Sequence, residues 1–329
     1  MAHLTLEQRY KIQTLREEGL SLKEIAEKVG KDKSVISREL QRNCDKRNGA
    51  YRAELAQRKY RERLEQKPKS LKFTEQIKET VTRFLQKKYS PEQIVGRCKL
   101  EGKPYVSLET IYQYVWADKR HKGKLYEHLR HRGRKYRRRG AAKDSRGRIR
   151  DTLSIDLRPP EVELKNRFGD LEMDTVVGKN HKGAILTIND RVTKLCWIKR
   201  LTGREAEPLK AATLDILTPI KDKLKTITVD NGKEFAEHLA ITKELNIPIY
   251  FAHPYHSWER GANENMNGLI RQYLPKGSSF ENLTEERVLY IQEELNNRPR
   301  KMLNYLTPKE YALANFGIEI CGLTGRLHL

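Results

Sequence analysis

The positive charge of this chain of 329 residues is confined to its first half. Residues 1–150 carry 41 Lys and Arg side chains against 19 acidic ones, whereas residues 151–329 carry 25 of each kind. An excess of this size attracts polyanions, because basic side chains neutralise phosphates and release their counterions. Ribosomal and membrane-surface proteins are basic as well, so charge alone does not identify the partner. The asymmetry predicts a front part that binds nucleic acid and a neutral back part that folds separately.

The four cysteines lie far apart in the sequence and form no C-x-x-C pair. This pattern indicates free thiols in a reducing compartment rather than a disulfide framework or a zinc ribbon. Charged residues interrupt every apolar run within a few positions, so neither a signal peptide nor a membrane span is indicated. We therefore expect a cytoplasmic protein with no membrane partner.

Residues 4–43, LTLEQRYKIQTLREEGLSLKEIAEKVGKDKSVISRELQRN, predict three helices within a domain that spans residues 1–66. Capping-box spacings begin the first two helices, and Gly19 and Gly30 supply their ends. The third helix is expected to expose five polar side chains that can reach phosphates and base edges in a major groove: Ser34, Ser37, Arg38, Gln41 and Arg42. The stretch resembles homeodomain-like helix-turn-helix domains of bacterial regulators and transposases. The alternative is a three-helix cluster with a solvated basic face.

Residues 70–128 predict a second helical domain, which follows a polar linker that contains proline. Ser90, followed by Pro91, and Ser107 are expected to begin two of its helices. The expected apolar seam consists of Ile94, Val95, Leu108, Ile111, Tyr112 and Val115. Thr110, Gln113 and Lys99 would then face outward. Both a second DNA-reading unit and a plain helical spacer fit this pattern.

A basic linker is expected over residues 129–158. Residues 130–150 hold eleven Lys or Arg side chains and a single acid, Asp144, so this stretch cannot bury a core and is expected to lack order without a partner. It could be a solvated connection or could lie along a phosphate backbone or minor groove, and the two are compatible. The side chains expected to touch DNA are Arg134, Lys135, Arg137, Arg138 and Arg139.

The neutral part, residues 159–329, alternates short apolar strands with helices. Three segments, DLEMDTVVG, AILTIND and KLCWIKRL, predict an antiparallel meander. A helix, the strand KTITVD, a helix, the strand IPIYFA and two further helices follow. This order predicts a mixed α/β fold with helices on both faces of the sheet, and it is the order of the ribonuclease-H-like fold.

Three acids occupy unusual positions in this order. Asp174 lies inside the first strand, Asp230 ends the fourth, and Glu264 lies on the helix expected over HSWERGANENMNGLIRQYLPKG, residues 256–277. Each alone has an ordinary explanation as a strand-edge, turn or helix-surface residue. In a sheet of this order, however, the first and fourth strands are neighbours. Clustered carboxylates favour Mg²⁺ or Mn²⁺, and two such ions about 3.5–4 Å apart support phosphoryl displacement.

Four segments, DLEMDTVVG, TVDNGKEF, HPYHSWERGANENMNGLIRQYLPKG and ELNNRPRKMLNYLTP, resemble the integrase-type DDE transposases of the insertion-sequence-thirty family. The resemblance covers essentially the whole chain. It implies that Asp174, Asp230 and Glu264 are the catalytic residues and bind two Mg²⁺ or Mn²⁺ ions. The 33 residues between Asp230 and Glu264 match the spacing of the family, whereas only 28 residues separate Asp230 from Glu259, the competitor for the third place.

Several neighbouring residues are expected to support this site: Asn231, Trp258, Arg260, Asn267 and Arg271. Glu259 is expected to have a structural or ion-paired role beside Trp258 and Arg260. His253 and His256 could contact DNA or stabilise their own loop. Asp190 is better explained as part of a hairpin turn.

The resemblance also implies an activity and its partners. The protein would bind double-stranded DNA at the terminal inverted repeats of its insertion sequence, cleave one strand to free a 3′-OH, and join it to target DNA. Holding two ends together would require a homodimer or a higher oligomer, in the bacterial cytoplasm and associated with the nucleoid through DNA. The alternatives are a catalytically silent DNA-binding regulator derived from a transposase and a plain nuclease of the ribonuclease-H type.

Overall fold

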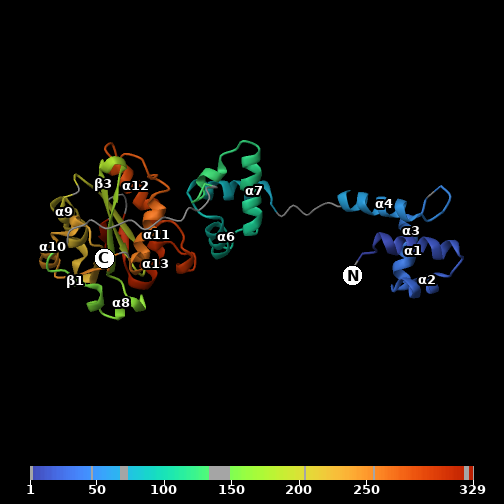
Figure 1. The fold of residues 1–329 in the computed structure, drawn as a ribbon, viewed down its shortest axis with the longest axis horizontal. Helices are drawn as coiled ribbons and strands as arrows, with labels where there is room; N and C mark the ends of the chain where they lie inside the picture. The colour runs from blue at the N-terminus through green and yellow to red at the C-terminus, as the bar shows by residue number, and fades with distance from the viewer. Residues whose placement is uncertain are drawn as a thin grey trace. The chain divides into compact units, whose positions relative to one another are not determined.

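The computed structural model describes residues 3–45, 47–66, 73–132, 149–203, 205–254, 256–321 and 326–328 (Figure 1). The chain forms two compact units, Met1–Lys72 and Phe73–Leu329. Within the described ranges, none of the helices combines the length and the apolar character needed to cross a membrane.

The first unit contains four helices: α1 (Leu6–Glu17), α2 (Leu22–Val29), α3 (Lys33–Asn43) and α4 (Ala53–Gln66). The first three confirm the prediction, and the expected capping boxes begin α1 and α2. Gly30 ends α2 with φ of 67°, a left-handed conformation that costs glycine little. The sequence did not indicate this highly charged helix α4; among its residues of described burial, 53–64, only Ala53 and Ala56 are buried.

The second unit begins with α5 (Glu75–Gln86), α6 (Pro91–Leu100) and α7 (Leu108–Arg120), followed by the short 3-10 helix η1 (Leu125–His128). Ser90 and Ser107 cap α6 and α7 as predicted. The assignment of Leu108 to the apolar seam is wrong, since this side chain is 42% exposed. It stands at the first position of α7, at the rim of the small core, and Val106 in the preceding loop is buried instead.

Helix α6 packs against residues 297–310, the chain segment that follows the helix Glu285–Asn296. The Tyr89 hydroxyl donates to the Asn297 carbonyl at 2.9 Å, and the Gln93 amide donates to the Pro299 carbonyl at 2.7 Å. Arg97 forms a bidentate ion pair with Glu310 at 2.6 and 2.7 Å. From the separate domain predicted over residues 70–128, residues 73–128 therefore share one compact unit with residues 159–329.

The sheet of the second unit has six strands in the order β1-β6-β5-β2-β3-β4. The strands are β1 (Leu153–Ser154), β2 (Asp170–Val177), β3 (Ala184–Asp190), β4 (Cys196–Leu201), β5 (Thr226–Val229) and β6 (Ile249–Phe251). The predicted antiparallel meander is confirmed as β2-β3-β4, and β2 and β5 are parallel neighbours. This is a mixed α/β, ribonuclease-H-like fold. The two-residue edge strand β1 was not predicted, because so short a segment has no periodic pattern.

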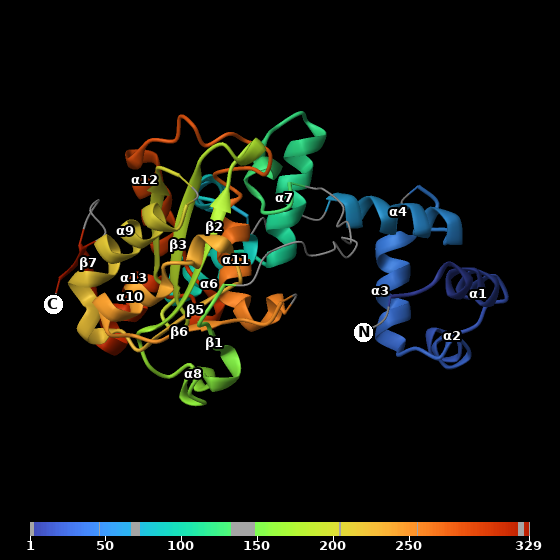
Figure 2. The same ribbon diagram turned by 60° about the vertical axis from the view of Figure 1, so that its left-hand side comes forward.

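Helices cover both faces of the sheet (Figures 1 and 2). One face packs on α9 (Ala206–Leu217) and α10 (His238–Leu245), the other on α11 (Gly261–Ile270) and α12 (Glu285–Asn296). The remaining elements are α8 (Glu161–Leu164), α13 (Pro308–Phe316), the hairpin β7 (Glu319–Cys321) and β8 (Arg326–His328), and the 3-10 helices η2 (Ile155–Leu157), η3 (Lys179–His181), η4 (Thr218–Lys223), η5 (Lys233–Phe235), η6 (Ser257–Arg260) and η7 (Lys301–Leu303).

The prediction of one continuous helix over residues 256–277 is wrong. The segment begins with η6, and α11 ends at Ile270. Beyond that point the backbone forms tighter bonds, from the Gln272 N–H to the Leu269 carbonyl and from the Tyr273 N–H to the Ile270 carbonyl. Pro275, which has no N–H, then prevents the helix from continuing.

Candidate active site

Strand β2 presents a row of acids toward α11. Because side chains alternate along a strand, Asp170, Glu172 and Asp174 share one face. Leu171 and Met173 point the other way, into the core beneath α9 and α10. Asp170 and Glu172 are buried, whereas Asp174 lies nearer the strand end and is partly exposed. Of these three acids, only Asp174 lies near the end of β5.

The register of β2 and β5 brings two aspartates together. Glu172 pairs with Thr228 in this parallel ladder. Continuing the register by two residues places Asp174 beside Asp230, which directly follows β5. In-register residues of parallel strands point to the same face, so both carboxylates open toward the start of α11.

The guanidinium of Arg260 lies between these two carboxylates. Its nitrogens are 3.7 Å from Asp174 Oδ1 and 3.3 Å from Asp230 Oδ2. Arg260 ends the 3-10 helix η6, so the turn that leads into α11 brings the cation to this point. The pair of carboxylates thus already surrounds a positive charge, as two nearby like charges require.

The environment of Asp174 opposes its ionisation. Burial raises the pKa of Asp174 to about 6, against the lowering effect of Arg260, and the neighbouring Asp230 raises it further. The Thr175 N–H donates to Asp174 Oδ1 at 2.9 Å, and the Asn267 amide donates to Oδ2 at 2.7 Å, and both bonds favour the carboxylate. A raised carboxyl pKa beside another acid is typical of functional sites.

Glu264 stands apart from the two aspartates. It lies in the first turn of α11, is exposed, and makes no hydrogen bond or ion pair with another residue that the structure describes. In the same described ranges, only one group of three or more His, Cys, Asp or Glu side chains has ligand atoms within 4.8 Å of one another, and that group is not these three acids. The structure therefore brings Asp174 and Asp230 together and leaves Glu264 one helical turn beyond Arg260.

The face of α11 that meets the sheet is polar at three points. The Asn263 N–H donates to Glu172 Oε2 at 2.9 Å, and its side-chain oxygen accepts from Asn189 at 2.5 Å. Asn267 holds Asp174, and Arg271 donates to the Val177 carbonyl at 3.0 Å. Asn263, Asn267 and Arg271 are spaced four residues apart, and together they fasten α11 along β2.

Known proteins share both the sequence and the domain content of this chain. A helix-turn-helix domain matches residues 2–43. The transposase for insertion sequence element IS4351 of Bacteroides fragilis is 54% identical over 308 residues, which cover 94% of each chain. The chain belongs to the insertion-sequence-thirty family of DDE transposases. The transposase InsI for IS30A of Escherichia coli K12 is 34% identical over 94% of this chain and 83% of its own length, and the transposase for IS1086 of Cupriavidus metallidurans is 33% identical over 92% and 91%.

The transposase also has structural neighbours among integrases. The catalytic core domain of BIV integrase is 18% identical, with a TM-score of 0.35, and the match covers 44% of this chain and 93% of that one. Enzymes of this family act with divalent metal ions. The comparisons give no support to the alternative of a catalytically silent regulator.

Two other residues expected to support the site of the transposase lie outside the cluster around Arg260. The Asn231 side chain donates to the Ala252 carbonyl at 2.6 Å and so ties the end of β5 to the end of β6. Trp258 is 69% exposed and stacks on His256 with ring centroids 4.3 Å apart. Asn231 thus acts on the backbone next to Asp230, whereas Trp258 packs beside a neighbouring group of side chains.

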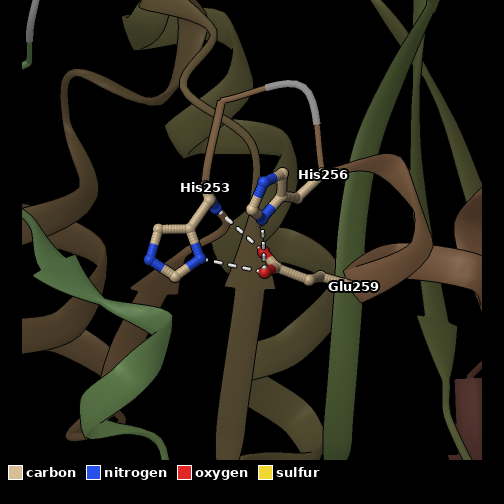
Figure 3. A group of neighbouring side chains, drawn as sticks. All are labelled: His253, His256 and Glu259. Atoms are coloured by element: carbon tan, nitrogen blue, oxygen red, sulfur yellow. Dashed lines mark hydrogen bonds and ion pairs between the residues drawn. The ribbon is translucent and has the colours of Figure 1, made fainter.

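That neighbouring group consists of His253, His256 and Glu259 (Figure 3). Both histidine Nδ1 atoms lie near Glu259 Oε1, at 2.9 and 3.1 Å. Glu259 therefore has the structural, ion-paired place that the sequence favoured for it, and it does not contact the two aspartates. Asp190, the other spare acid, accepts the backbone N–H groups of Val192 and Thr193 and so closes the β3–β4 turn.

A buried ion pair that the sequence did not predict lies beneath α11. Glu172 and Arg191 approach to 3.1 Å, with side chains 2% and 5% exposed. Arg191 also binds Glu163 and the Val162 carbonyl, and so joins α8 to the sheet. The sequence does contain a signal for this pair. Asp170, Glu172 and Asp174 alternate along β2, so Glu172 lies on the same strand face as Asp174, two residues before it.

The DNA-facing residues expected on α3, Ser34, Ser37, Arg38, Gln41 and Arg42, are all exposed. In the second helical unit Gln113 is exposed, whereas Thr110 is half-buried and its hydroxyl lies 2.8 Å from the Ser107 hydroxyl that caps α7. The expected contacts of the basic linker, Arg134, Lys135, Arg137, Arg138 and Arg139, lie outside the described residues.

A basic cavity of about 690 Å³ lies beside α11. Arg130 reaches it from the end of the helical unit and donates to Asn265 at 3.0 Å. Arg298 and Arg300 line it from the segment on which α6 packs, and both are buried. Burial lowers the pKa of Arg298 to about 9 and that of Arg300 to about 10, so both remain positively charged at neutral pH.

Proposed function

We propose that Asp174, Asp230 and Glu264 bind the divalent ions with which the transposase cleaves and joins DNA, namely Mg²⁺ or Mn²⁺, with two ions in each active site. The observation that supports this is the guanidinium of Arg260, 3.7 and 3.3 Å from the two aspartates. A cation between these oxygens is already favourable, and oxygen-only donors suit Mg²⁺ and Mn²⁺.

Hydrogen bonds from neighbouring residues orient the carboxylate oxygens of the two aspartates. The Gly232 N–H holds Asp230 Oδ1 at 2.9 Å, and Asn267 holds Asp174 Oδ2 at 2.7 Å. Asp230 thereby keeps Oδ2 for a cation, whereas both oxygens of Asp174 accept one hydrogen bond each and would offer a cation their remaining lone pairs. Glu264 would supply an exposed carboxylate from α11. When bound, the ions activate the attacking hydroxyl and stabilise the leaving oxygen of an in-line displacement. Arg260, released from the aspartates, becomes free to pair with a phosphate.

We further propose that α3 reads the terminal inverted repeats of the element with Ser34, Ser37, Arg38, Gln41 and Arg42. Their exposure on one helix that also carries basic side chains supports a major-groove contact. Thr110 and Gln113 of α7 would add a weaker contact, and Arg130, the exposed arginine at the basic cavity, would face a phosphate. Joining two ends to target DNA implies at least a homodimer.

The decisive experiment replaces Glu264 with Gln, which keeps the shape of the side chain and removes its charge. We expect Glu264→Gln to bind inverted-repeat DNA like the unmodified protein, because the residue lies far in sequence from α3. Mg²⁺-dependent nicking and strand transfer should fall to background. Gel-shift and strand-transfer assays with labelled element ends measure the two properties separately.

Glu286→Gln is the matched control, because Glu286 is also an exposed glutamate in the first turn of a helix. This variant should keep full activity. If Glu264→Gln retained strand transfer, the assignment of Glu264 would be wrong. If Asp174→Asn and Asp230→Asn also retained it, the proposed metal site would be wrong as a whole.

The basic linker has its own test. Deleting residues 134–139 removes five Lys and Arg side chains, which should weaken binding to every DNA sequence and lower the slope of log K against log salt by about 0.9 for each lost phosphate contact. Fluorescence anisotropy at several salt concentrations measures this slope. An effect limited to the preferred sequence would contradict a phosphate-binding role.

A further inference from the structure

The segment between β6 and α11 gathers three side chains of a kind that binds metal ions. One ring nitrogen of His253, one of His256 and a Glu259 oxygen all lie within 4.8 Å of one another (Figure 3). The two Nδ1 atoms are 2.9 and 3.1 Å from Glu259 Oε1. All three residues are partly exposed, so an ion can reach them from solvent.

These separations are close to those of a metal centre. Ligands that bind zinc at about 2.0–2.1 Å in a tetrahedron lie roughly 3.3 Å apart. Both nitrogen–oxygen distances therefore need to grow by only a few tenths of an ångström. Two imidazole nitrogens and one carboxylate oxygen are a donor set that suits Zn²⁺, whereas Mg²⁺ prefers oxygen ligands alone.

The surroundings orient the ligands as they do in metal sites. The His253 backbone N–H donates to Glu259 Oε2 at 2.9 Å, which leaves Oε1 directed at the two rings. His253 Nε2 lies 3.0 Å from Asp156 Oδ2. A carboxylate on the far nitrogen of a histidine fixes the ring and raises its basicity as a ligand. Asp156 comes from η2, next to the edge strand β1, so the group joins two distant parts of the chain.

We propose that His253, His256 and Glu259 form a second cation site, separate from the three catalytic acids and selective for Zn²⁺ over Mg²⁺. Its role is structural. Glu259 directly precedes Arg260, so an ion bound here would fasten the turn that brings Arg260 to the aspartates and leads into α11, which carries Glu264. Without an ion, the same three side chains would be held by hydrogen bonds alone, which is the competing possibility.

The test uses the full chain, stripped of metal with a chelator and titrated with Zn²⁺ in excess Mg²⁺. We expect one ion per chain by calorimetry, undisturbed by Mg²⁺. Substitution with Co²⁺ should produce the visible absorption of a tetrahedral site. Trp258 stacks on His256, so its fluorescence should change with the same midpoint. Trp258→Phe should abolish that optical signal while leaving the calorimetric stoichiometry intact.

Variants locate the ion. His253→Ala and His256→Ala should each abolish tight binding, and Asp156→Asn should weaken it about 10–100-fold, as loss of a supporting carboxylate does. His121→Ala, which removes an exposed histidine at the end of α7, should change nothing.

Two results of the Zn²⁺ titrations would overturn the proposal. One is an absence of Zn²⁺ binding to the unmodified chain, and the other is binding that survives loss of both His253 and His256. The Co²⁺ spectrum of the unmodified chain needs no variant to fold. A thiolate charge-transfer band in it would place the ion on a cysteine such as Cys44, which is partly exposed, and would equally overturn the assignment.

Discussion

Two groups of helices stand at the front of the transposase: α1–α4, which form the first unit, and α5–α7, which open the second unit. Their helices begin with the same local signals but lie in different surroundings. Capping boxes start α1 and α2 in the first unit and α6 in the second. In the first unit the outer face of α3 remains exposed. In the second, α6 directs Gln93 and Arg97 at the segment 297–310. Local signals thus define helices, whereas the available partners decide which face remains free for DNA.

The charges that stabilise the two units differ in the same way. Arg9 is buried inside the first unit, 2.8 Å from Glu39, with side chains 2% and 10% exposed. Arg97 of the second unit pairs with Glu310 of α13, whose side chain is 40% exposed. The first unit is therefore internally cross-linked by a desolvated pair, whereas within the second unit the helices α5–α7 are fastened to the catalytic fold by a more exposed pair.

The largest expected effect comes from breaking the internal pair. Arg9→Met leaves Glu39 buried without its partner, which should destabilise the first unit by about 3–5 kcal/mol. Hydrogen exchange at the amides of α1 and α3 in the full chain measures this locally. Replacing both residues with Met should restore most of the loss. Lys11→Met, at an exposed position of the same helix, is the control, and an equal effect there would refute the role of the pair.

A glycine in α6 tests the packing of this helix against the catalytic fold of the same unit. A Cβ at Gly96 would lie 2.2–2.4 Å from ring atoms of Tyr305, so Gly96→Ala forces these surfaces apart at a cost of about 1–3 kcal/mol. Protection of the α6 amides should fall, and adding Tyr305→Ala should return it. Gly261→Ala, where a Cβ meets nothing within 4 Å, should leave α6 unchanged. Unaltered α6 protection in Gly96→Ala would show that this contact does not hold α6 on the catalytic fold.

DNA binding should separate the two outer faces. Arg38→Ala is expected to cost about 1–3 kcal/mol with the cognate repeat if the arginine reads a base. Gln113→Ala should cost only about 0.5–1.5 kcal/mol, because a neutral amide makes a weaker contact than a charged group. Anisotropy titrations at one salt concentration compare them. Equal or reversed losses would show that α7 reads DNA as strongly as α3.

The smallest expected losses of stability come from removing helix caps, and they should be equal in α1 and α6. Thr5→Ala and Ser90→Ala each remove the side-chain bond that caps a helix, which typically costs about 1 kcal/mol. Hydrogen exchange in the first turns of α1 and α6 measures each loss. A markedly larger effect for Ser90→Ala would mean that its cap is coupled to the docking of α6.

Much of the fold followed from short-range pattern. The capping residues, the alternation in β2–β4 and the parallel neighbours β2 and β5 were all predictable, because each depends on spacing along the chain or on the order of elements. Asp174 and Asp230 could be paired for the same reason. The place of Arg260 between them could not, since it depends on a 3-10 turn that has no periodic signal.

Other features depended on partners distant in sequence. The buried pairs Arg9–Glu39 and Glu172–Arg191 look like surface charges until the packing is known. Helix α4 was missed because the core touches so little of it. Leu108 was wrongly assigned to a seam because periodicity gives the direction of a side chain but not where a core ends. Glu264 remains a prediction from spacing and family resemblance.

The distance along the chain between the reading helix and the third acid sets an order of events during synthesis. Helix α3 ends at Asn43, and Glu264 is made 221 residues later. At about 5–20 residues per second, a growing chain carries its folded first unit for roughly 10–45 s before its catalytic set is complete. The segment that receives α6 is translated later still. With the roles proposed for α3 and Glu264, a nascent transposase would be able to bind DNA before it could cut it.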